Sequence, residues 1–405
     1  MRWAVFSSLL ADIWTNQSRT NFPTVNVSSL PTGAFMGLFI LRRLGVMLLT
    51  ALCLTFIVFW LTNLFPNLEK LAKNQGNARM EIHEVSTWLS NRGYRSHVDP
   101  ALITASSQDQ ISDAEFEDAI TGFDPRLIIN YGEWLGVLPG YEIEGFDGKI
   151  RRRCPEGQRF CGVLQGQWGF STVFRDDVST IISKRLALTG KLMFWVMMVM
   201  VPGALIIGVL AGMREGSRTD RTLSTVSIVS TATPEYVSGV VFISLFATGT
   251  FGMQWFKGTA TSAMDDANFW NFFLPVITIA LYGMGYIARM TRASMTEVMT
   301  AQYIRTARLK GVAFRTIVLK HALRNALIAP FTVIMLQFPW LLNGVVIVET
   351  LFNYKGFGWT LVQAASNNDI ELLLGVSVVS VFVVLVTQLI SDIGYVFLNP
   401  RIRIS

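Results

Sequence analysis

Six apolar runs of roughly 20 residues limit what this chain can fold into. A helix needs about 20 residues at ~1.5 Å rise to cross the ~30 Å hydrocarbon core of a membrane. Charged side chains are nearly absent inside the runs, since each would cost ~2.5 kcal/mol or more at the bilayer centre. The sequence therefore predicts an all-α membrane protein with six transmembrane helices. The runs cover residues 44–65, 186–213, 223–256, 274–288 with its flanks, 326–348 and 372–396.

The composition excludes an ordinary soluble domain. Apolar residues make up 51% of the chain and charged residues only 15%, and the mean hydropathy is +0.42. A soluble domain of this length would have to expose large apolar patches. Part of the solvent around the folded chain is therefore lipid.

The distribution of Lys and Arg predicts the orientation, because short loops rich in these residues stay on the cytoplasmic side. Two connections, 256–273 and 351–371, contain only Lys257 and Lys355 and are expected outside. We expect a multi-pass protein of the bacterial inner (cytoplasmic) membrane with both termini in the cytoplasm. The net charge of +6 reflects this topology, so no nucleic-acid partner is expected. The basic segments are 42–43, 214–221, 289–324 and 401–403.

The chain divides into four segments. Residues 1–35 form an N-terminal cytoplasmic extension, and two interpretations stay open: translation begins at Met36, which opens the stretch MGLFILRRLGVM, or the extension is a disordered tail. Residues 36–65 supply the first transmembrane helix. Residues 66–185 form a periplasmic insert of about 120 residues, long enough for a small folded domain. Residues 186–405 form the membrane core with five further helices.

The insert contains two cysteines, Cys154 and Cys161, in the stretch RRRCPEGQRFCG. An oxidising compartment favours a disulfide between them, and closing so short a loop contributes about 2.5 kcal/mol on the chain-entropy estimate. The alternative is two free thiols. With no second Cys or His cluster nearby, the pair makes a poor zinc site, and no metal is expected.

Catalytic motifs are missing from the sequence. His83 is followed by Glu84, but Thr87 stands where a metalloprotease motif H-E-x-x-H needs its second His. No G-x-S-x-G elbow occurs. The stretch Gly190-Lys191-Leu192 lacks the upstream Gly and the Ser or Thr of a phosphate-binding loop. The chain is therefore not expected to be an enzyme or to hold a cofactor of its own.

A cytoplasmic stretch between the fourth and fifth helices, residues 297–325, is too long and too apolar for a simple connection. Apolar and basic residues alternate along it, and Gly311 interrupts the pattern, which predicts a helix, a turn and a second helix. A short amphipathic helix needs a partner surface, such as a groove on another protein. Alternatively it lies on the lipid surface. Periodicity alone favours neither interpretation.

The motif RTARLKG at 305–311, followed by HALRN at 321–325, resembles the cytoplasmic loop of binding-protein-dependent ABC transporter permeases. Within these permeases, the loop most resembles that of the first-permease (B-type) subunit in the dipeptide/oligopeptide (and nickel) permease family. The wider family has E-A-A, three residues, Gly, nine residues, then I-x-L-P. Ala307, Gly311 and Leu323 match this pattern, whereas Arg305, Thr306, His321 and Arg324 depart from it. The departures put in doubt any contact that depends on the acidic residue.

Further segments resemble the same family and extend the match over residues 164–403 and the first helix, so that 186–405 resembles an ABC permease core. The insert up to about residue 162 has no role by resemblance. The matching segments are LQGQWGFS at 164–171, GVLAGMREGSRTDR at 208–221, TPEYVSG at 233–239, LPVITIAL at 274–281, ARMTRASMTEVM at 288–299, VVIVETLFNYKGFG at 345–358 and NPRIR at 399–403.

The resemblance implies a channel half of an ATP-driven importer for peptides. Its partners would be a second homologous permease subunit, two ATP-binding-cassette ATPase subunits that bind ATP and Mg, and a periplasmic substrate-binding protein. The cytoplasmic stretch would be the ATPase-coupling loop, with a coupling helix that transmits alternating access. The coupling residues would be Arg305, Thr306, Ala307, Lys310, Gly311, Val312, Phe314 and Leu323.

Other functions stay open. The same importer class also carries nickel, opines or glycosides. A secondary transporter would show inverted repeats and several buried carboxylates, which the sequence lacks. A membrane-anchored sensor would explain the insert but would need a signalling domain, and none is present.

Glu235 is the one acidic residue expected at membrane depth, next to Pro234, which should break the long run 223–256. An intramembrane charge typically lines a pathway or pairs with a partner. Glu235 is therefore a candidate for the translocation path, unless the broken helix places it at the cytoplasmic interface. Gln337 and Asn343 are weaker candidates, because such residues also form hydrogen bonds between helices.

Overall fold

The computed structural model describes residues 32–64, 127–140, 142–144, 150–152, 154–155, 157–249 and 254–398. The N-terminal extension up to residue 31 and much of the insert lie outside the described residues. The chain divides into two compact units, Met1–Leu49 with Ile404–Ser405 and Thr50–Arg403. Helix α2 (Thr32–Leu64) runs from the first unit into the second.

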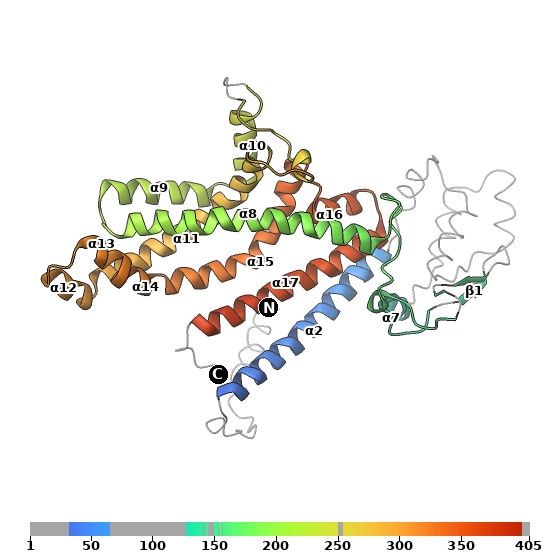
Figure 1. Cartoon of the computed structure of the whole chain (residues 1–405). Coiled ribbons are helices and arrows are strands. Elements are labelled where there is room, and N and C mark those ends of the chain that lie inside the picture. Colours follow the sequence, from blue (N-terminus) through green and yellow to red (C-terminus); the bar gives the residue numbers. More distant parts are fainter. Residues whose placement is uncertain are drawn as a thin grey trace, which may run out of the picture. The chain divides into compact units, whose positions relative to one another are not determined.

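The second unit is built mainly from helices (Figure 1). Among the described residues, three turns of 3-10 or π helix, labelled η, accompany the α-helices. The elements that follow α2 are α7 (Leu127–Leu135), β1 (Glu142–Glu144), β2 (Ile150–Arg152), η3 (Val163–Gln165), α8 (Val178–Gly212), α9 (Arg218–Ala232), α10 (Glu235–Phe246), η4 (Thr261–Ala263), α11 (Phe269–Thr300), α12 (Gln302–Leu309), α13 (Phe314–Thr316), η5 (Ile317–Ala322), α14 (Leu323–Ala326), α15 (Ile328–Leu351), α16 (Phe357–Ser366) and α17 (Ile370–Leu398).

Four of the described helices are long and apolar enough to cross a membrane: α2, α8, α11 and α17. The number rises to six if each of two bent pairs counts as one span, namely α9 with α10 and Phe314–Ala326 with Ile328–Gln337. The first pair turns through 107° at Thr233 and Pro234, the break that Pro234 predicts. The fold is therefore that of a helical, multi-pass membrane protein.

The packing of α8 against α11 places the two helices side by side (Figure 1). A methyl group on Gly208 would lie 2.4 Å from Cβ of Thr291, and one on Gly212 would lie 2.7 Å from the carbonyl oxygen of Arg292. Both glycines are therefore needed for the two backbones to approach this closely.

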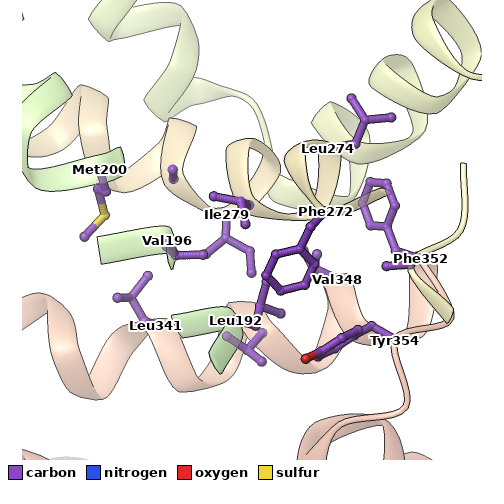
Figure 2. Close-up of a cluster of buried hydrophobic side chains, with 14 of the residues drawn as sticks. Leu192, Val196, Met200, Phe272, Leu274, Ile279, Leu341, Val348, Phe352 and Tyr354 are labelled. Carbon is purple, nitrogen blue, oxygen red and sulfur yellow. The ribbon is translucent and has the colours of Figure 1, made fainter. Parts of the chain in front are cut away.

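The largest buried cluster fills the space between α8, α11 and α15 (Figure 2). Met200 from α8, Ile279 from α11 and Leu341 from α15 are fully shielded. Phe352 and Tyr354, in the loop after α15, close one end of the cluster. The helix cores thus meet through interlocking aliphatic and aromatic side chains.

Some features differ from the sequence prediction. Helix α2 begins at Thr32, within the predicted N-terminal extension. Helix α8 begins at Val178 rather than at residue 186, because Val178, Ile181 and Ile182 are buried at helical spacing although charged residues follow them. Helix α16 occupies a stretch predicted to be a loop. The described part of the insert includes an antiparallel pair, β1 with β2, which an all-α prediction does not contain.

Candidate functional site

The stretch after α11 folds as the predicted helix, turn and second helix. We define the α12–α13 hairpin as residues 302–316. Gly311 has φ +73°, a left-handed conformation that glycine adopts without strain. The amide of Val312 donates to the carbonyl of Ala307 (3.2 Å) and that of Gly311 to the carbonyl of Arg308 (3.0 Å). These two hydrogen bonds form a Schellman motif that ends α12.

One face of the hairpin is fixed to the helix bundle. Ile304 is fully buried and packs in one cluster with Met295 and Met299 of α11. Ile317 and Val318 of η5 join the same cluster. Burial of each such side chain stabilises the arrangement by about 1.5–3 kcal/mol.

Polar contacts hold the segment that follows. The Asn325 amide donates to the Tyr303 hydroxyl (2.9 Å), and the Ser294 hydroxyl donates to the carbonyl of Ala326 (2.8 Å). The hairpin is therefore tied to α11 on one side and leads through η5 and α14 to α15. A displacement of the hairpin would move both long helices.

The opposite face of this segment is exposed and combines apolar with basic side chains. Leu309 is 82% exposed and Leu319 is 64% exposed. The eight residues predicted for coupling divide between the two faces. Arg305, Thr306, Lys310, Gly311 and Phe314 are exposed, whereas Ala307, Val312 and Leu323 are partly buried.

The turn between α8 and α9 is fixed by an ion pair with a buried carboxylate, which sequence reasoning did not single out. Asp220 is only 2% exposed. Its carboxylate accepts two hydrogen bonds from the Arg292 guanidinium, at 2.5 and 2.9 Å, one from the Ser224 hydroxyl, and one from the Gly216 amide. The Asp220 amide in turn donates to the hydroxyl of Ser217, the N-cap of α9. The spacing of Ser217 and Asp220 is a helix-start signal that could have indicated the start of α9.

A second buried carboxylate, Glu349 near the end of α15, lies towards the other end of α8. It accepts hydrogen bonds from the Thr189 hydroxyl and from the amide of Trp359 in the first turn of α16 (2.9 Å). A negative group here complements the positive N-terminal end of a helix. A buried lone acid at the end of an apolar run was the available signal.

Neighbouring groups extend this network. The Tyr354 hydroxyl donates to the carbonyl of Leu188 (3.0 Å), and burial together with the charge of Glu349 raises the pKa of Tyr354. The Arg185 guanidinium donates to the carbonyl of Lys355 (2.7 Å) and lies over the rings of Phe174 and Trp359. The loop after α15 is thereby fixed to α8.

Two of the three candidates for a translocation path, Glu235 and Gln337, are buried. Glu235 begins α10, is 8% exposed, and its Oε1 has no hydrogen-bond partner within the described residues. It lies against Gly344 of α15, where a methyl group would come within 2.3 Å of Oε2. Gln337 is 7% exposed, and its Nε2 likewise has no partner in the described part of the chain. Asn343 lies on α15, one residue before Gly344.

The structure joins Cys154 and Cys161 by a disulfide with a Cα–Cα distance of 5.5 Å. Cys161 is fully buried. The preceding helix, α7, packs on the part of α2 that belongs to the second unit, where the hydroxyls of Tyr131 and Thr55 are 2.7 Å apart. Within the described residues, no group of three or more His, Cys, Asp or Glu side chains is placed to hold a metal ion.

Comparison with known proteins relates this architecture to membrane transport. Residues 204–404 match the family described as binding-protein-dependent transport system inner membrane component. A probable peptide ABC transporter permease of Sinorhizobium fredii is 34% identical over 60% of this chain and 77% of its own length. An oligopeptide transport system permease of Bacillus subtilis is 31% identical over 74% of this chain and 89% of its own.

Two further proteins are similar to this chain. A putative peptide transport system permease of Brucella abortus is 29% identical over 75% of this chain and 89% of its own length. In a crystal structure of an amino acid ABC transporter with histidines, one chain aligns with 54% of this chain and 94% of its own, with 16% identity and a TM-score of 0.41.

Proposed function

Since the chain belongs to the family of binding-protein-dependent transport system inner membrane components, we propose that it forms half of the channel of an ATP-driven importer for peptides. The other half is a second, homologous permease subunit. Two ATPase subunits, which bind ATP and Mg, drive transport from the cytoplasmic side. A periplasmic binding protein delivers the substrate. Both termini of this chain lie in the cytoplasm.

Peptides are the proposed substrate because the similar permeases of Sinorhizobium fredii and Bacillus subtilis are named for peptide and oligopeptide transport. Nickel, opines or glycosides are the alternatives within the same importer class. The chain itself is proposed to catalyse no reaction.

The observation that carries the proposal is the asymmetry of the α12–α13 hairpin. Its inner face is buried against α11, while Leu309 and Arg305 project outward at the end of the bundle. An apolar side chain that is 82% exposed beside basic residues suits a groove on another protein. We assign that groove to the ATPase subunit.

The mechanism follows from how the hairpin is held. Because it is anchored to α11 and continues into α15, a partner that moves it shifts these two helices together. ATP binding and substrate binding then bias the same two states of the bundle, one open to each side of the membrane. Glu235, Gln337 and Asn343 are proposed to meet the substrate or to form contacts between helices that change between those states.

The decisive experiment is affinity purification of this chain from its native membrane, followed by ATPase assays in lipid vesicles. We expect two ATPase subunits and a second permease to co-purify, and peptides presented with the binding protein to stimulate ATP hydrolysis. Transport by this chain alone, with no ATP-hydrolysing partner, would refute the proposal.

A further inference from the structure

A pocket of about 550 Å³ lies between the α12–α13 hairpin and the turn that joins α8 to α9. Arg214 and Glu215 of the turn form one wall, and Arg308 and Phe314 of the hairpin form the other. The pocket belongs entirely to the second unit. Its volume lies in the range of sites that take up small ligands or side chains.

Both walls are held in place by interactions described above. Asp220 accepts the amide of Gly216 and so fixes the turn. The Schellman motif at Gly311 fixes the hairpin. The guanidinium of Arg214 lies 5.3 Å from the centre of the Phe314 ring, which joins the two walls by a cation–π contact. The pocket is therefore a built feature of the fold.

The lining favours an anionic group. Arg214 and Arg308 contribute two positive charges against the single negative charge of Glu215, and all three side chains are exposed. Thr296 and Thr300 of α11 also line the pocket. Among the described residues, Oγ1 of Thr296 is buried without a hydrogen-bond partner. Arginine is well suited to hold a carboxylate, because its planar guanidinium can donate two parallel hydrogen bonds.

We propose that this pocket receives an acidic side chain of the ATPase subunit, with Arg214 and Arg308 as the receiving groups. This inference rests on the proposed function, since it places a second contact beside the outward face of the hairpin. Charge complementarity selects an acidic residue. Arg308 directly precedes the exposed Leu309 in the hairpin, and this selects the ATPase subunit as its source.

The second contact has a mechanical consequence. A partner that touches only the hairpin moves α11 and α15. A side chain held by Arg214 as well would also engage the turn between α8 and α9, and Gly212 at the end of α8 is itself packed on α11. A movement of the ATPase subunit would then be transmitted to α8 as well as to α11 and α15.

The test uses the purified complete importer with a photo-crosslinking residue placed in this chain at position 215, and in a separate preparation at position 309. Mass spectrometry identifies the attached segment. We expect the probe at position 309 to capture the ATPase subunit, and the probe at position 215 to capture a segment of the same subunit that contains Asp or Glu. Capture at 309 of the ATPase, with only lipid or the second permease captured at 215, overturns this inference and leaves the proposed function standing. Failure of both probes to reach an ATPase overturns both.

Charge reversal gives an independent readout. Arg214→Glu and Arg308→Glu should each weaken retention of the ATPase subunits roughly tenfold in the same complex. The matched control is Arg221→Glu, an exposed position on α9 that does not line the pocket. Changing the captured acidic residue to Lys should restore retention to Arg308→Glu, which excludes misfolding as the cause. Equal effects of all three reversals, or no restoration, would contradict the pocket as a charge-specific contact.

Discussion

Arg292 of α11 donates two hydrogen bonds to the carboxylate of Asp220 on α9, although the two residues are 72 positions apart. Asp220 is almost fully buried, whereas the Arg292 side chain is 32% exposed. The pair therefore connects two helices through the Asp220 carboxylate, which is shielded from water.

Removing either partner should cost stability unequally. We expect Asp220→Ala to destabilise the purified protein by about 2 kcal/mol, because it removes four hydrogen bonds while the Arg292 side chain, 32% exposed, can still reach water. Arg292→Ala leaves a buried carboxylate unpaired and should cost at least as much. The midpoint of thermal unfolding in detergent measures both. The double variant should lose less than the sum of the two, and strict additivity would contradict a direct coupling.

The left-handed turn at Gly311 should be required for coupling. A methyl group at this position meets no described atom within 4 Å, so only backbone conformation opposes substitution. Gly311→Val should cost about 1–2 kcal/mol at the turn and reduce transport per ATP hydrolysed. Gly311→Asn is the matched control, since Asn tolerates positive φ. Equal coupling in the two variants would argue against this role.

Gly311→Asp should also assemble yet transport poorly, because it places a negative charge at the proposed ATPase contact.

Two glycines beside the contact between Glu349 and Thr189 should respond in opposite directions to substitution by alanine. A methyl group at Gly356 would lie 2.2 Å from Oε1 of Glu349 and 2.6 Å from the Thr189 hydroxyl. Gly356→Ala should therefore lower the unfolding temperature. Gly190, one residue after Thr189, is exposed inside α8 with nothing near its missing methyl group. Gly190→Ala should gain about 0.5–1 kcal/mol of helix stability. Destabilisation by both would show that the space around the network does not decide the outcome.

The contact of Glu235 with Gly344 should affect transport. Gly344→Ala would force the carboxylate out of its position, and Glu235→Gln would remove its charge. We expect Glu235→Gln to change the relative uptake of positively and negatively charged peptides roughly tenfold, the scale of about 1.4 kcal/mol. Uptake by vesicles containing the complete importer is the measurement. Unchanged selectivity would assign Glu235 to a contact between helices.

The bond between Cys154 and Cys161 should protect both thiols. Cys53 is free and exposed, so the experiment uses a Cys53→Ser background. Without reductant, a maleimide mass tag should add to neither remaining cysteine, and after reduction it should add to both. Cys154→Ser should then destabilise the surrounding loop by about 2.5 kcal/mol, which limited proteolysis would detect. Labelling before reduction would contradict the bond in the native protein.

The long apolar helices and the broken span could be predicted because their causes are local. Runs of apolar residues require lipid, and Pro234 cannot continue a helix through its missing amide hydrogen. The turn at Gly311 was also predictable from one residue. These features depend on neighbours in the sequence, so periodicity and turn chemistry are sufficient.

The buried polar network could not be predicted in the same way. Asp220 with Arg292, and Glu349 with Thr189, join residues that are distant in the sequence. A lone charged residue near an apolar run is equally compatible with a loop and with a contact between helices until its partner is known. The start of α8 at Val178 shows the same limit, because Lys184 and Arg185 interrupt the apolar pattern while tertiary packing extends the helix.

The π-helical turn η5, Ile317–Ala322, sits between the hairpin and α15. Such a turn accommodates one residue more than an α-helix of the same rise. Each residue of an α-helix rotates the chain by about 100°. Tightening this turn to α-helical geometry would therefore twist the exposed Leu319 and everything before it about the helix axis. A change in the geometry of this one turn would therefore alter the orientation of the hairpin relative to α15.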